Sequence, residues 1–209
     1  MSPKLLAIAA ATLAATACAT YDEPYAGGMP TVEYDPATPG PIRGVGVEGH
    51  DIVQMADIMV HDMLLNPTIA AAVPQRRVII DAEYFRNESA QRINASIITD
   101  NLRANLQKAA AGRIRFVSRE SMGMVAEERD FKRDGVTDQG TLIPASAQLG
   151  ADFRLIGRIA STDQIAASQG LIQRYNQVTF EMIDLQTSEI VWTGMYNFAR
   201  AGADDVIYR

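Results

Sequence analysis

Apolar side chains recur at helical spacing in two long stretches of the chain. Residues 50–65 repeat them every three or four positions and end at Asn66 and Pro67, so the pattern predicts a helix that stops there. Residues 95–111 repeat the pattern behind Asn94, a residue type favoured at helix N-termini, and before a glycine that favours termination. The sequence therefore predicts two amphipathic helices, each with one face turned to a core.

Five further segments have the spacing or the composition of strands. Residues 76–85 and 113–119 are short runs rich in β-branched and other apolar residues, whereas residues 151–160, 174–185 and 189–198 alternate apolar and polar positions. The first two flank the second helix, and a strand, helix and strand in that order form a right-handed βαβ unit with parallel strands. The predicted fold is an α/β sandwich, a mixed β-sheet of about five strands flanked by helices.

Two more helices are expected between the second and third strands. One covers residues 120–135, and a short one covers residues 144–150 and starts at a proline. Residues 161–176 are expected to form a long connection between two strands. In the first helix, Met55, Met59 and Met63 share a face, which we expect to pack against the sheet; the alternative is an adaptable docking surface.

The first 49 residues differ in composition from the rest. Residues 1–17 combine a single Lys, an apolar run and small residues, as in a signal peptide, and they lead directly into Cys18, the only cysteine. This arrangement is typical of a bacterial lipoprotein signal, in which Cys18 is lipidated; the alternative is a plain signal peptide with an incidental cysteine. Residues 18–49 hold five of the nine prolines and predict a disordered acidic tether, so the globular domain is expected over residues 50–209.

Charge and cysteine content exclude several classes of protein. The net charge is −6 and the pI is about 4.9, whereas nucleic-acid binding needs a basic surface. A single cysteine allows neither an intramolecular disulfide nor a zinc site built from several thiolates. We therefore expect no nucleic-acid partner and no metal.

Candidate catalytic groups are few. His50 and His61, each followed by Asp, are interpreted as solvated surface residues, because a metal-dependent hydrolase needs further histidines. Glu127, Glu128 and Asp130 alternate with basic residues and are expected to form exposed ion pairs. The glycines of "GVGVEG" lack the preceding strand that a dinucleotide site needs, and no serine-nucleophile motif occurs. The sequence predicts a binding module, with no enzyme activity and no cofactor.

Three stretches carry a resemblance to a known family: "NASIITDNLRANLQKAAAGRIRFVSR", "GADFRLIGRI" and "VTFEMIDLQTSEIVWTG". They resemble the LpoB family, outer-membrane lipoprotein activators of penicillin-binding proteins. Ser188 stands where the last turn of the family pattern has glycine. The residues that fall on the family pattern are Leu102, Leu106, Phe116, Val117, Gly150, Ala151, Asp152, Phe153, Leu155, Gly157, Asp184, Leu185, Thr187, Glu189, Ile190 and Trp192.

The resemblance implies a function and a partner. Such a protein would be anchored in the outer membrane, face the periplasm, and activate a class A penicillin-binding protein, which synthesises peptidoglycan. By the family pattern the contact would lie around residues 151–160, so Arg154, Ile156, Arg158 and Glu189 are the candidate partner-binding residues. The alternative is a non-enzymatic lipoprotein of envelope or export assembly, related to the curli secretion lipoproteins.

Overall fold

The computed structural model describes residues 31–70, 75–137, 149–203 and 206–207. Cys18, the predicted signal peptide and nearly all of the predicted helix at 144–150 lie outside these residues. The chain divides into two compact units, and the second, Tyr34–Arg209, contains every element described below. No helix among the described residues has the length and apolar character needed to span a bilayer.

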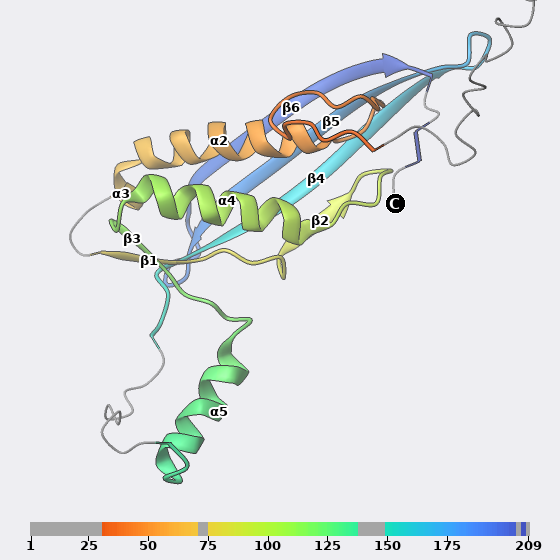
Figure 1. The fold of residues 1–209 in the computed structure, drawn as a ribbon. Helices are drawn as coiled ribbons and strands as arrows, with labels where there is room; N and C mark the ends of the chain where they lie inside the picture. Colours follow the sequence, from red (N-terminus) through yellow and green to blue (C-terminus); the bar gives the residue numbers. More distant parts are fainter. Residues whose placement is uncertain (1–30, 71–74, 138–148, 204–205, 208–209) are drawn as a thin grey trace, which may run out of the picture. The chain divides into compact units, whose positions relative to one another are not determined.

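The second unit is built on one mixed sheet of six strands, which confirms the predicted fold class (Figure 1). The strand order is β3-β1-β4-β5-β6, and β2 also pairs with β4. Strands β1 and β3 pair in parallel and α4 lies between them in sequence, so the predicted βαβ unit is confirmed. The elements are α2 (Gly49–Leu65), α3 (Pro67–Ala70), β1 (Arg76–Ile79), β2 (Phe85–Glu88), α4 (Ala95–Ala110), β3 (Ile114–Phe116), α5 (Met122–Arg133), β4 (Phe153–Ala166), β5 (Leu171–Asp184) and β6 (Ile190–Gly202).

The core lies between the sheet and helices α2 and α4, which cover the same face (Figure 1). Phe153, Leu155 and Ile159 of β4 alternate toward this face and are buried. The methionine stripe of α2 is buried in the same cluster, so the expectation that it packs against the sheet is confirmed. Trp192 of β6 adds its ring to the core and donates through Nε1 to Asp62 of α2 at 2.8 Å.

The predicted strand at residues 76–85 is wrong as a single element, because the structure contains two short strands there. Ile79 pairs with Arg154, and Phe85 pairs with Gly157. Five residues therefore separate Ile79 from Phe85, whereas only two residues separate their partners on β4. The extra residues loop out around Asp81, whose Oδ1 accepts a hydrogen bond from the backbone N of Glu83. Such local side-chain bonds compete with a strand ladder and explain the break.

The long connection expected at residues 161–176 is also wrong. Strand β4 continues to Ala166 and β5 begins at Leu171, and their antiparallel ladder includes every residue between Ser161 and the turn. Asp163 and Arg174 face each other in this ladder and form a two-bonded ion pair at 2.7 Å. The Arg174 hydrogen bond is the largest influence on the Asp163 carboxyl and lowers its pKa.

Packing begins before the predicted domain boundary at residue 50. Val45 and Val47 are buried, and α2 starts at Gly49 with Glu48 as its N-cap. Glu48 and Asp51 bond to each other's backbone in a capping box. The last residues of the segment interpreted as tether are therefore part of the folded unit.

The turn between β5 and β6 carries a strained residue. Ser188 has a φ of 64°, in the left-handed region that glycine adopts most readily. Asp184 fixes the turn by accepting backbone hydrogen bonds from Gln186 at 2.7 Å and Thr187 at 3.0 Å, and these bonds lower the pKa of its carboxyl. The turn is thus closed by side-chain bonds although it lacks the glycine of the family pattern.

Replacing this serine by glycine should stabilise the protein. Relief of the left-handed conformation is worth about 1–2 kcal/mol, and the greater freedom of glycine in the unfolded chain offsets about 0.5–1 kcal/mol of it. We expect Ser188→Gly to raise the free energy of unfolding by about 0.5–1 kcal/mol in urea titrations. Ser188→Ala is the control and should give no gain; a Ser188→Gly variant less stable than the parent would contradict the strain.

Candidate functional site

The sheet face opposite α2 and α4 carries the candidate site. On β4, Arg154, Ile156 and Arg158 alternate with the buried core residues and therefore project to this opposite face. Ile156 pairs with Glu181 of β5, and Arg158 pairs with Thr179, so their side chains lie next to each other across the strands. Two of the four predicted partner-binding residues, Ile156 and Arg158, are thus placed together.

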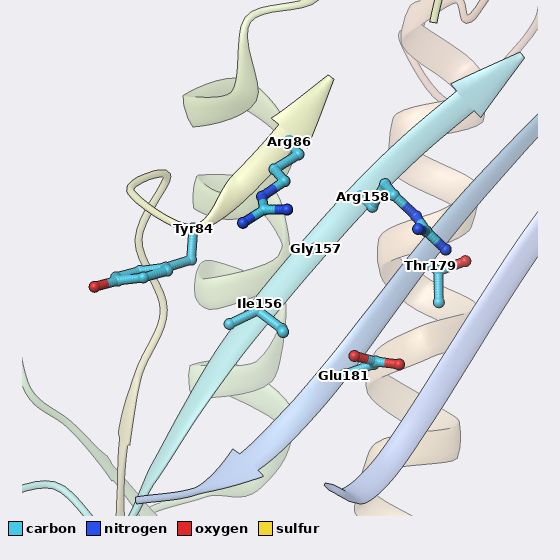
Figure 2. Close-up of a pocket in the computed structure, with 7 residues that line it drawn as sticks. All are labelled: Tyr84, Arg86, Ile156, Gly157, Arg158, Thr179 and Glu181. Carbon is cyan, nitrogen blue, oxygen red and sulfur yellow. The ribbon is translucent and has the colours of Figure 1, made fainter. Parts of the chain in front are cut away.

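These side chains line a shallow cavity of about 300 Å³ (Figure 2). Tyr84 and Arg86 contribute from β2 and the residue before it, and the rest of the lining comes from β4 and β5. Gly157 forms part of the floor, because its missing side chain would point into the core, where a Cβ would come within 2.6 Å of Phe85. We call the seven lining residues the open-face pocket: Tyr84, Arg86, Ile156, Gly157, Arg158, Thr179 and Glu181.

Two arginines of the open-face pocket are available to a partner. Arg158 lies 4.0 Å from Glu88, and both side chains are about half exposed, so this pair is weak. Arg86 is exposed and has no ion pair within the described part of the chain. Glu181 and Thr179 add an acceptor and a hydroxyl at the other wall. The arrangement fits a partner surface with carboxylates beside an apolar group that contacts Tyr84 and Ile156.

Arg154 has a different environment from Arg158, although both project from the same face of β4. Its side chain is 15% exposed, and its guanidinium lies 2.8 Å from the buried carboxylate of Asp81 and also contacts Glu83. The guanidinium stacks over the Tyr84 ring, 4.1 Å from the ring centre. Burial alone would lower the pKa of Arg154, but the hydrogen bonds that its guanidinium donates to Asp81 and then to Glu83 outweigh the burial and raise that pKa. These contacts give Arg154 a structural role in holding the loop before β2.

Glu189 is not brought to the open-face pocket. It is exposed in the turn between β5 and β6, where its backbone O accepts from the backbone N of Asp184. Asp184 pairs with Phe153, three positions along β4 from Ile156, which is about 10 Å. The sequence missed Tyr84, Arg86, Thr179 and Glu181, and only the pairing of β2 and β5 with β4 could have indicated them.

The expectation that both histidines are solvated is wrong for His50. His61 is exposed, but His50 is buried at the start of α2, with its Nε2 3.0 Å from Nη2 of Arg200. Its Nδ1 lies 3.4 Å from Glu48 but outside hydrogen-bond geometry. The burial follows from Arg200 of β6, which reaches across to Asp51 and covers the ring.

The remaining candidate groups show no catalytic arrangement. Glu128 pairs with Lys132 at 3.4 Å and Asp130 with Arg133 at 2.9 Å, both on α5, so the predicted exposed ion pairs are confirmed for these two of the three acids. In the portion of the chain that the structure describes, no group of three or more His, Cys, Asp or Glu side chains could hold a metal ion. The open-face pocket is therefore the best candidate site, and it is suited to binding.

Several solved protein structures are similar to this chain. Among solved structures, the chain is similar to the LpoB C-terminal domain from Escherichia coli, with 20% identity, a TM-score of 0.44, and coverage of 72% of this chain and 99% of that one. The LpoB C-terminal domain from Salmonella enterica has 19% identity and a TM-score of 0.44, with coverage of 71% of this chain and 98% of that one. The lipoprotein GNA1162 from Neisseria meningitidis has 16% identity and a TM-score of 0.32, with coverage of 61% of this chain and 81% of that one. No match was found among curated proteins.

A family model decides the assignment. The model described as "Peptidoglycan-synthase activator LpoB" matches residues 51–198, which are 148 of the 209 residues. The match spans the elements from α2 through most of β6, including the three strands that form the open-face pocket. The chain therefore belongs to the LpoB family of peptidoglycan-synthase activators.

Proposed function

We propose that this protein is an outer-membrane lipoprotein that binds a class A penicillin-binding protein through the open-face pocket and activates it allosterically. The observation that carries the proposal is the pair Arg86 and Arg158, two exposed guanidinium groups beside Tyr84 and Ile156 on a sheet face opposite the helices. An interface of this kind combines charge complementarity with an apolar anchor. Family membership supplies the class of partner.

A protein without catalytic groups can change a partner's rate only through differential binding. It must bind the active state of the synthase more tightly than the inactive state, because equal affinity shifts no equilibrium. A tenfold stimulation needs a difference of about 1.4 kcal/mol between the two states. A modest interface that includes two charge-assisted hydrogen bonds can supply this difference.

Cys18 provides the anchor in this proposal. Its thiol stands at the end of the signal peptide, and several acyl chains hold a protein in a membrane far more stably than one chain does. We expect Cys18→Ser to move the protein from the outer-membrane fraction to the soluble periplasmic fraction. Immunoblots of the two fractions measure this shift, and palmitate labelling of the parent protein measures the lipidation. Ala19→Ser is the control and should stay in the membrane; a Cys18→Ser variant that remains there would contradict lipidation at this residue.

Co-purification tests the proposed partner. The mature chain, used as bait in detergent-solubilised envelopes of its own cell, should retain a class A synthase identified by mass spectrometry. A bait with reversed charge at Arg86 and Arg158 is the matched control and should lose it. Recovery of an export component by both baits, without any synthase, would contradict the proposal and favour a role in envelope or export assembly.

A further inference from the structure

The main chain of residues 45–47 is held by side chains from other parts of the chain. Val47 donates its N–H to Oε1 of Gln91 at 2.7 Å, and its carbonyl accepts from Nε2 of the same Gln91 at 2.9 Å. The carbonyl of Val45 accepts from Nδ2 of Asn176 at 3.0 Å. The carbonyl of Gly46 accepts from Nη1 of Arg200 at 2.7 Å. Three side chains from distant parts of the sequence thus bind three consecutive peptide groups.

Two of these side chains, Asn176 and Arg200, are themselves fixed in place. Asn176 is 1% exposed on β5. Arg200 of β6 is held by both carboxylate oxygens of Asp51, at 2.9 and 2.7 Å, and lies 4.5 Å from the centre of the Phe198 ring. Preorganised donors of this kind lose little freedom when they bind the chain. We call Gln91, Asn176 and Arg200 the tether clamp.

The tether clamp lies on the face of the sheet that the helices cover. Asn176 and Arg200 are in register with core-facing positions of β5 and β6, and the buried side chains of Val45 and Val47 enter the same side. The open-face pocket lies on the opposite side, because Ile156 and Arg158 alternate with the core residues of β4. Residues 45–47 are therefore held on the side of the sheet away from the open-face pocket.

We propose that Gln91, Asn176 and Arg200 are positioning residues that fix residues 45–47 on the helix-covered side of the sheet, so that the chain leading toward the membrane anchor joins the sheet on the side opposite the open-face pocket. The existence of a membrane anchor before these residues rests on the proposed function. The position of residues 45–47 rests on the hydrogen bonds described above. Any pull between Cys18 and the domain passes through residues 44–48 and is resisted by the clamp. Release of these five residues would lengthen the reach of the tether by about 17 Å at about 3.3 Å per residue.

Distances between two spin labels test the clamp directly. The mature chain with Cys18→Ser receives labels at Ile42, just before the clamped residues, and at Ile97 on the exposed side of α4; both side chains are exposed. We expect one narrow distance distribution in this protein and a distribution at least twice as broad after Gln91→Ala with Asn176→Ala. Gln177→Ala, the neighbouring position on the other face of β5, is the matched control and should leave the distribution narrow.

A second measurement keeps the proposal testable if the double variant folds poorly. Gln91→Ala alone should speed hydrogen exchange at the Val47 amide at least tenfold, with no change at core amides of α4. A broad distribution in the parent, or an unchanged distribution together with unchanged Val47 exchange in the variants, would overturn the proposal. Neither measurement involves a synthase, so a failure of the clamp and a failure of the proposed function give different results.

Discussion

Replacing Arg154 by methionine should lower the free energy of unfolding by about 3 kcal/mol. The carboxylate of Asp81 is 3% exposed and lies 2.8 Å from the Arg154 guanidinium, so the variant leaves a buried charge without its partner. Glu83 is more than half exposed and adds little, because water solvates it when the arginine is removed. Methionine keeps the apolar stem, so the loss reports the charge and not the packing.

The partner substitution provides the control. Asp81→Asn combined with Arg154→Met removes both charges and should recover most of the loss, to within about 1 kcal/mol of the parent in urea titrations. An Arg154→Met protein that unfolds like the parent but no longer binds a synthase would show instead that Arg154 is a partner contact.

Reversing both arginines of the open-face pocket should abolish partner binding. Arg86→Glu with Arg158→Glu removes two cations that, in the proposed interface, face carboxylates of the partner, and places two anions there, so we expect at least about 30-fold weaker binding, or about 2 kcal/mol. Both side chains are exposed, and the ion pair of Arg158 with Glu88 spans 4.0 Å, so the free energy of unfolding should change by less than about 0.5 kcal/mol. Binding is measured by surface plasmon resonance with purified class A synthase, and unfolding is measured in urea.

A charge-matched variant distinguishes the pocket from net charge. Lys132→Glu with Arg133→Glu makes the same change on α5, where both cations pair with acids of the same helix. It should bind the synthase as the parent does. Equal losses in the two double variants would mean that long-range charge, and not the open-face pocket, governs association.

The sequence predicted the elements whose signals are local. Helix α4 has its expected cap, with Asn94 accepting from the backbone N of Ser96 at 3.0 Å, and its apolar face is buried. Alternation predicted a strand at residues 151–160, and β4 begins within this range at Phe153 and continues to Ala166. Such features depend on residues within one turn or one strand, and a single sequence contains them.

Features that depend on distant partners were not predictable. The ion pair that holds the loop at Asp81 depends on Arg154, 73 residues away, and the burial of His50 depends on Arg200, 150 residues away. Arg86 reaches the open-face pocket only because β2 pairs in parallel with β4 beyond that break. Pairing register is a tertiary property, so only part of the candidate site could be predicted from the sequence. Two of the candidate residues line the open-face pocket, whereas Arg154 is held by ion pairs.

The most direct test of the central claim follows the polymerisation of lipid II by a purified class A synthase of the same cell. The mature chain with Cys18→Ser is added in increasing amounts, and the variant with Arg86→Glu and Arg158→Glu is the matched control. The account predicts a saturable rise in rate of at least several-fold with the former and none with the latter. Absence of both binding and rate change with every class A synthase of that cell would contradict it.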